Sequence, residues 1–107
     1  MNPRTHAILL GLALFFIGAP TVAQESTLVG QGKKLFSDQG CYGCHTVGKT
    51  GTPMGPDLSR VGFKYRESYL VQWLRDPSVQ KPTAHMPKIA MTESEARALA
   101  AFLASLK

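Results

Sequence analysis

The chain is poor in cysteine: among its 107 residues, Cys41 and Cys44 are the only two. Small exported domains that rely on disulfides usually contain several bridges. A bond between these two residues would close a loop too short to restrict much of the unfolded chain. A structural disulfide therefore explains little about why this pair is present.

Strand patterns are missing as well. No run of alternating or continuous β-branched residues lasts beyond a few positions, whereas helical spacing of apolar residues is clear in several places. A thioredoxin-like redox site needs its Cys-x-x-Cys pair at the start of a helix in a fold with parallel strands. The sequence provides no such strands, and we expect an all-α domain.

The sequence also lacks an apolar run of the usual membrane-spanning length. Residues 7–19 are thirteen residues without charge, whereas a spanning helix needs about 20. With Arg4 before this run and small residues after it, the pattern is typical of a secretory signal. We predict a signal peptide over residues 1–23 and a mature domain over residues 24–107, exported to the periplasm. The alternative is an uncleaved segment that anchors the chain to the inner membrane.

A compact motif stands out against these absences: Cys-Tyr-Gly-Cys-His at residues 41–45. A zinc site needs four Cys or His ligands, and outside the predicted signal only His85 could complete one. Zinc would also leave the adjacency of Cys44 and His45 unexplained. Cys-x-x-Cys-His is the attachment sequence of c-type haem, in which the two thiols add to the vinyl groups and the histidine lies under the iron. The motif therefore predicts haem c bound through Cys41, Cys44 and His45.

Three helices are predicted around this motif. The first covers residues 26–40, capped by Ser26 or Thr27, and ends at Gly40 because a left-handed backbone favours glycine. Gly32 within it marks a close helix crossing, since a glycine inside a helix otherwise costs about 1 kcal/mol. The apolar face of this helix contains Leu28, Leu35 and Phe36.

The other two helices lie further along the chain. One covers residues 66–77 and is stopped by the proline at its end. The last covers residues 92–107 and begins with a capping box formed by Thr92 and Glu95. The apolar faces of these two helices contain Tyr69, Leu70, Trp73 and Leu74 in the first, and Leu99, Phe102, Leu103 and Leu106 in the second.

No sheet is expected between these helices. Residues 46–62 and 78–90 are rich in glycine and proline and are predicted to be loops. Two long loops are unusual in so small a domain unless they lie against a cofactor. The loops therefore agree with a bound haem.

Several segments follow the order found in one protein family. They are Gly-Lys-Lys-Leu-Phe, the Cys-Tyr-Gly-Cys-His motif, Gly-Pro-Asp-Leu, the aromatic helix, Met-Pro and the final Ala-Leu-Ala-Ala-Phe-Leu. Through these segments, nearly all of residues 27–107 resembles a small class I cytochrome c. The resemblance is closest to short bacterial domains that act as soluble carriers or as cytochrome subunits of oxidases and dehydrogenases. It implies an all-α domain of three or more helices wrapped around one haem c, attached through two thioethers. The implied function is electron transfer without catalysis.

The resemblance also implies the second axial ligand of the iron, a methionine in the loop before the last helix. Met86 matches that position, so His45 and Met86 are the expected metal ligands. Such ligation would saturate the iron and favour its ferrous state. Met91 and Met54 remain alternatives, as does His85 through bis-histidine ligation.

The Gly-Pro-Asp-Leu segment has a second implied role. In similar proteins the carbonyl of its proline, here Pro56, accepts a hydrogen bond from the proximal imidazole and tunes the ligand. An ordinary turn proline fits the sequence equally well. Arg60, Tyr69 and Trp73 are candidate neighbours of the haem, and Trp73 is expected to contribute by packing more than by a specific hydrogen bond.

Acidic residues are few: seven Asp and Glu stand against twelve Lys and Arg, a net charge of +5. Lys49, Lys64, Lys81 and Lys88 fall in or near the loops expected around the haem. A basic rim would steer the chain to acidic patches on a redox donor and acceptor. The plainer alternative is that these lysines confer solubility. The predicted export and the lack of any known binding motif argue against nucleic acid as a partner.

Two further functions remain open besides the free carrier. The chain could be a membrane-tethered cytochrome subunit of an oxidase or reductase complex. It could also be a haem sensor or enzyme with an open distal site, for which His85 is the candidate acid–base group.

Overall fold

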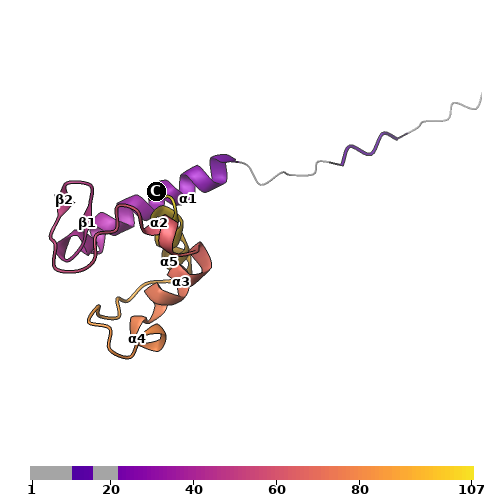
Figure 1. Ribbon diagram of the computed structural model, residues 1–107. Coiled ribbons are helices and arrows are strands. Elements are labelled where there is room, and N and C mark those ends of the chain that lie inside the picture. Colours follow the sequence, from indigo (N-terminus) through magenta and orange to yellow (C-terminus); the bar gives the residue numbers. More distant parts are fainter. Residues whose placement is uncertain (1–10, 16–21) are drawn as a thin grey trace, which may run out of the picture.

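Helices joined by two long loops make up most of the structure (Figure 1). The computed structural model describes residues 11–15 and 22–107. The all-α class predicted from the sequence is confirmed. The elements in chain order are α1 (Val22–Asp38), the 3-10 turn η1 (Cys41–Gly43), β1 (Thr46–Val47), β2 (Thr50–Gly51), α2 (Val61–Lys64), α3 (Glu67–Arg75), α4 (Pro77–Gln80) and α5 (Glu93–Ala104).

The structure differs from the expectation of three helices and two plain loops. β1 and β2 pair antiparallel, with Thr46 opposite Gly51, so the first loop contains a small hairpin where no sheet was expected. Gly48 adopts a positive φ of 60° between the two strands, which lets the chain reverse there. The short helices α2 and α4 occupy the end of the first predicted loop and the start of the second.

The start of α1 corrects the predicted helix boundary. The helix begins at Val22, so Ser26 and Thr27 lie inside it and do not cap it. Glu25 in the first turn suits the positive end of the helix dipole, and no glycine or proline interrupts the chain between Val22 and Ser26. In Figure 1 this end of α1 extends past the other helices, and Leu28 accordingly remains 37% exposed.

The core is formed where α5 packs against α1 and α3. The capping box predicted at the start of α5 is present: Glu95 N donates to Thr92 Oγ1 at 3.1 Å, and Thr92 N donates to Glu95 Oε1 at 2.8 Å. The buried cluster contains Phe36, Val61, Leu70, Leu74, Ala96, Leu99, Ala100, Phe102 and Leu103.

The crossing of α1 and α5 depends on Gly32. A Cβ atom at this position would lie 2.7 Å from Phe102 Cβ and would meet the carbonyl oxygen of Ala98. Contacts this short do not occur in packed proteins, so a side chain here would force the two helices apart. The close crossing predicted from Gly32 is confirmed.

Gly32→Ala should therefore destabilise the domain by about 1–3 kcal/mol or more through overpacking. At Gly30, two residues earlier in the same helix, an added Cβ atom would have no neighbour within 4 Å, which makes Gly30→Ala the matched control. Because alanine is the better helix former, the control should be neutral or stabilising by up to about 1 kcal/mol. Denaturant unfolding of the holoprotein, followed by circular dichroism, measures both. Equal effects of the two substitutions would contradict the role assigned to Gly32.

The second predicted helix ends earlier than expected, and a new helix follows it. α3 stops at Arg75, and Pro77 begins α4 because proline is well suited to the first helical position. Asp76 caps α4, with Asp76 Oδ1 accepting from Ser78 N at 3.1 Å. The Arg75 Nε atom donates to Glu93 Oε2 at 2.9 Å, which joins the end of α3 to the start of α5.

Candidate cofactor site

The Cys-Tyr-Gly-Cys-His segment begins directly where α1 ends. Gly40 has a φ of 77°, the left-handed conformation expected at this position, and turns the chain into η1. His45 N donates to the Cys41 carbonyl at 2.9 Å, so the motif closes into one helical turn. The Tyr42 ring packs edge-on against Phe36, with ring centroids 4.7 Å apart. The motif is thus fixed to the buried face of α1.

The two cysteines are not bonded to each other. Cys41 is half-buried and Cys44 is exposed. Burial raises the pKa of the Cys41 thiol above its ordinary value, and the neighbouring Cys44 adds to this effect. Redox-active dithiols depend on the opposite shift, a lowered thiol pKa. The local environment therefore does not favour the redox alternative.

Zinc coordination was the other alternative weighed for these cysteines. Within residues 11–15 and 22–107, no three His, Cys, Asp or Glu side chains gather where they could hold a metal ion. His85 is exposed, on the loop between α4 and α5. The structure does not bring this histidine to the cysteines as a ligand cluster.

The imidazole of His45 is held from one side by the following loop. Its Nδ1 atom lies 2.8 Å from the carbonyl oxygen of Pro56. A carbonyl can only accept, so Nδ1 is the donor in this contact, and Nε2 is the ring nitrogen that points away from it. At Gly55, a Cβ atom would lie 2.9 Å from His45 Cε1, which means that the chain passes directly over the ring edge. The result is an imidazole of fixed orientation in which Nε2 is the nitrogen left to coordinate a metal.

Asp57 ties this loop to the hairpin beside His45. Its Oδ1 atom accepts hydrogen bonds from Ser59 Oγ at 2.6 Å, Ser59 N at 3.0 Å and Thr46 Oγ1 at 3.1 Å. The hydrogen bonds from Ser59 hold the pKa of the Asp57 carboxyl below its usual value. No role for Asp57 was predicted from the sequence. The Asp-x-Ser spacing, typical of a turn closed by an aspartate side chain, is the signal that could have indicated it.

The three candidate methionines have different surroundings. Met54 is 76% exposed, whereas Met86 and Met91 both pack partly against the core. The indole Nε1 of Trp73 lies 3.2 Å from Met86 Sδ and donates a hydrogen bond to it. Within the part of the chain that the structure describes, the other two candidate sulfurs have no such partner. Trp73 was expected to act by packing, so this hydrogen bond corrects that expectation.

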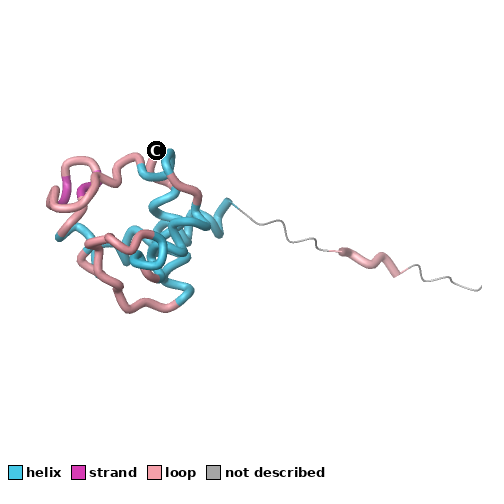
Figure 2. The backbone as a smooth tube through the Cα atoms, turned by 60° about the horizontal axis from the view of Figure 1, so that its bottom comes forward, coloured by secondary structure: helices cyan, strands magenta, loops and turns pink. Residues whose placement is uncertain are grey.

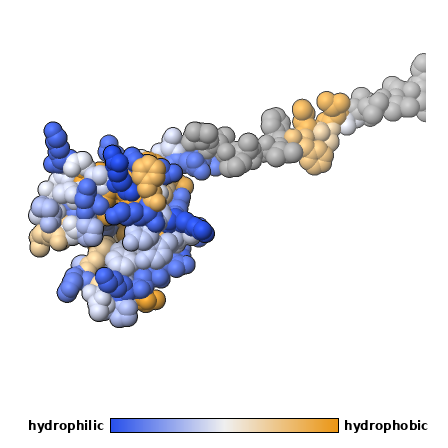
Figure 3. Space-filling model, in the orientation of Figure 1, coloured by the Kyte–Doolittle hydropathy of each residue, from blue (hydrophilic) through white to orange (hydrophobic). Residues whose placement is uncertain are grey.

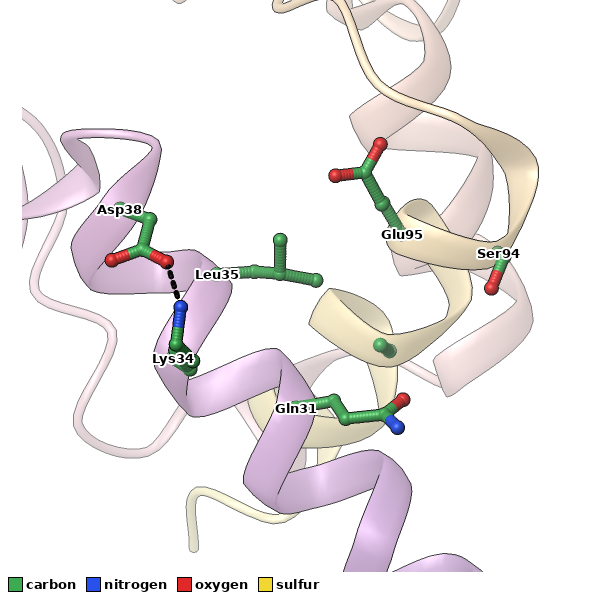
Figure 4. Close-up of a pocket in the computed structure, with 7 residues that line it drawn as sticks. Gln31, Lys34, Leu35, Asp38, Ser94 and Glu95 are labelled. Carbon is green, nitrogen blue, oxygen red and sulfur yellow. Dashed lines mark hydrogen bonds and ion pairs between the residues drawn. The ribbon is translucent and has the colours of Figure 1, made fainter.

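A shallow hollow between α1 and the start of α5 contains none of these residues (Figure 4). Lys34 and Asp38 on its α1 side form an ion pair 2.6 Å long, and Glu95 on the other side is engaged in the capping box. These charged groups already have partners within the protein. We regard this hollow as a crevice between two packed helices and not as a binding site.

The model of the family described as cytochrome c matches residues 29–107. The chain belongs to the cytochrome c family. The predicted resemblance and the class I cytochrome c-like fold are confirmed, because the match covers α2 to α5 and most of α1. Membership implies covalently bound haem c with its iron and supports haem-based electron transfer.

One protein similar to this cytochrome is a subunit of an oxidase. Cytochrome c oxidase subunit 2 of Alkalihalophilus pseudofirmus is 38% identical over 90 residues, covering 76% of this chain and 26% of the relative. The chain thus spans about a quarter of the length of that relative.

The predicted signal peptide lies mostly outside the described residues, which begin with 11–15 and resume at Val22. Among the helices that the structure describes, none combines the length and apolar character needed to cross a membrane. The predicted processing after residue 23 therefore stays a prediction.

The side chains of this cytochrome fit the haem that the family implies. Two unpaired thiols stand in the Cys-x-x-Cys spacing just after α1, and His45 offers Nε2 on a ring whose orientation is fixed through Nδ1. Met86 offers a thioether that is partly shielded by the core. The donor set is one of soft and neutral atoms, as haem iron in electron carriers requires.

Proposed function

We propose that the chain transfers electrons through a single haem c, with thioethers from Cys41 and Cys44 and with His45 and Met86 as axial ligands. One observation carries the proposal: both axial donors are held by hydrogen bonds within the protein. Pro56 fixes His45 at 2.8 Å, and Trp73 fixes Met86 at 3.2 Å. Neither Met91 nor Met54 has a comparable restraint in the described structure.

The haem supplies one-electron exchange between ferric and ferrous iron when bound. The residues of the chain set the conditions for that exchange. The hydrogen bond to Pro56 would orient the His45 ring and strengthen Nε2 as a ligand. The thioether of Met86 would be the second ligand of the iron and would favour the ferrous state. With His45 and Met86 both bound, the iron would have no position left for a substrate.

The proposed partners are a redox donor and acceptor that present acidic patches. Lys49, Lys64, Lys81 and Lys88 are all exposed, and hydrophilic side chains cover most of the face shown in Figure 3. Positive charge of this kind accelerates encounter with an acidic surface at low ionic strength. We place the protein outside the cytoplasm, in the periplasm or anchored at the inner membrane, as the N-terminal sequence pattern predicts.

A second candidate has specific support. The similarity to part of an oxidase subunit favours a cytochrome that serves a membrane-bound oxidase over one that diffuses between several enzymes. The chemistry at the iron is the same in both cases. Copurification with a terminal oxidase from membranes would distinguish the dedicated subunit from the free carrier.

The carrier function is tested by the ligand state of the wild-type holoprotein. With Met86 bound, the ferric protein should show the far-red absorption band of a sulfur–iron bond, and the ferrous protein should bind carbon monoxide slowly and weakly. Absorption spectra of both oxidation states measure this. A missing band together with rapid carbon monoxide binding would mean an open distal site, and the function would then be that of a sensor or enzyme.

A further inference from the structure

We propose that Asp57 is a positioning residue that sets the direction of the Pro56 carbonyl toward His45, and through it the strength of His45 as an iron ligand. The inference deepens the proposed function and rests on His45 being an axial ligand. Its basis is geometric. The Pro56 carbonyl oxygen, 2.8 Å from His45 Nδ1, belongs to the planar peptide unit that joins Pro56 to Asp57. Fixing the backbone of Asp57 therefore fixes the acceptor that faces the imidazole.

Pro56 has no backbone N–H with which to anchor itself. Its neighbours provide two anchors: Gly55 N and Leu58 N donate to backbone carbonyls of residues 44–46, at 2.5 Å and 2.8 Å respectively. These bonds fix where the segment passes beside the motif. They do not by themselves fix the plane of the peptide unit between Pro56 and Asp57, so a restraint within the segment is needed.

The side chain of Asp57 supplies that restraint. Its Oδ1 atom accepts from Ser59 N at 3.0 Å, which closes a turn and restricts the backbone of Asp57. The same atom accepts from Ser59 Oγ at 2.6 Å and from Thr46 Oγ1 at 3.1 Å. Ser59 Oγ in turn accepts from Gly48 N at 2.7 Å. The network therefore joins the turn to two points of the β1–β2 hairpin.

The charge of Asp57 strengthens this network. Three donors converge on one oxygen, and hydrogen bonds to an ionised acceptor are shorter and stronger than those between neutral groups. The bonds from Ser59 hold the pKa of the Asp57 carboxyl below its usual value, so the group is ionised at neutral pH. Asp57 is exposed, and solvent and salt screen its charge at a distance. We therefore assign its effect on His45 to geometry more than to charge.

The consequence for the iron follows from the chemistry of imidazole. A carbonyl aimed at Nδ1 strengthens the other ring nitrogen as a ligand. A stronger donor stabilises ferric iron more than ferrous iron, because ferric iron has the higher charge, and it therefore lowers the reduction potential. If the Pro56 carbonyl turns away, the potential should rise and the Nδ1 proton of His45 should exchange faster with solvent.

The test compares Asp57→Asn with Asp57→Ala in the holoprotein. Asparagine keeps an oxygen that closes the turn and removes the charge, whereas alanine removes both. By proton NMR, the Nδ1 proton of His45 should exchange about 2- to 10-fold faster in Asp57→Ala, as expected for the loss of about one hydrogen bond. In Asp57→Asn it should exchange at the wild-type rate. The reduction potential should rise in both variants, and further in Asp57→Ala.

Asp76→Ala is the matched control, because Asp76 forms the same kind of network elsewhere. Its Oδ1 atom accepts from Ser78 N at 3.1 Å and from Ser78 Oγ at 2.6 Å. This network caps α4 and has no bond to the segment beside His45. The control should lower the free energy of unfolding and leave the exchange of the His45 Nδ1 proton unchanged.

Two results would overturn the proposal. If Asp57→Ala matches Asp57→Asn in both proton exchange and potential, Asp57 acts through its charge alone. If Asp57→Ala and Asp76→Ala accelerate the exchange equally, the cause is a general loss of stability and not the direction of the Pro56 carbonyl.

Two further outcomes keep the test decisive. If the wild-type holoprotein shows no Nδ1 proton of an iron-bound His45, the ligand assignment in the proposed function fails, and the role of Asp57 fails with it. If Asp57→Ala does not fold, Ser59→Ala removes the 2.6 Å bond to Asp57 and the bond from Gly48 but keeps the carboxylate. This variant should also accelerate the exchange, and an unchanged rate would contradict the proposal.

Discussion

Replacing both Cys41 and Cys44 by alanine should yield a polypeptide without covalent haem that is largely unfolded. A domain of this size obtains only about 3–5 kcal/mol from its hydrophobic core and usually needs a further constraint. Cys41 packs against the buried cluster next to α1, so the attached haem would extend that core. Because binding energy that exists only in the folded state stabilises folding, its loss should remove most of the net stability.

The measurement has two parts. Haem staining after denaturing electrophoresis should detect the wild type and not the double variant, and circular dichroism should show loss of helix. Met54→Ala is the matched control, since this exposed residue lies in the loop that follows the hairpin and has little packing to lose. A double variant that is haem-free yet well folded would defeat the argument that haem is the missing constraint.

Met86→Ala should produce the largest change at the iron. The far-red band should disappear, the ferrous protein should bind carbon monoxide readily, and the reduction potential should fall on the order of 0.1 V, a fraction of the ~0.8 V range that axial ligands control. The physical reason is the loss of a thioether that favours ferrous iron and closes the axial position. Absorption spectroscopy and redox titration provide the three readouts.

Met91→Ala is the control for this variant. Met91 is half-buried against the core just before the Thr92 cap of α5, so its truncation should cost at most about 2–5 kcal/mol of stability and leave the iron unchanged. If the two variants exchange their effects, Met91 is the ligand and the carrier function remains. If neither variant loses the far-red band, both assignments are wrong, and Met54 becomes the candidate ligand.

Local sequence signals predicted the ends and crossings of the larger helices. The capping box depends on Thr92 and Glu95, three residues apart. The left-handed turn at Gly40 and the close helix crossing at Gly32 both depend on the missing side chain of glycine. The start of α1 was missed because several helix formers precede the supposed cap. The four-residue helices α2 and α4 are too short for any periodicity to reveal them.

The site was predictable to a lesser degree. The spacing of the cysteines and His45 is a local motif, but the contact of His45 with Pro56 joins residues 11 positions apart and was implied only by family resemblance. The bond between Trp73 and Met86 depends on how a loop returns to α3, which no local pattern encodes. In Figure 2 most of the loops lie on one side of the molecule and most of the helices on the other.

The contact between Arg75 and Glu93 has a consequence for the entropy of the segment that contains Met86. It joins the residues on either side of that segment, so residues 76–92 form a closed loop and not a free connection between two helices. A closed loop samples fewer conformations, and ordering Met86 at the iron therefore costs less free energy. The ion pair is exposed, and Arg75 holds the pKa of the Glu93 carboxyl below its usual value. The Arg75–Glu93 interaction contributes fully above the ordinary pKa of a glutamate and weakens as the pH falls through the lowered pKa of Glu93. Salt weakens it as well, because the pair is exposed. Acid and salt would therefore increase the conformational freedom of Met86, although neither residue of the pair contacts the iron.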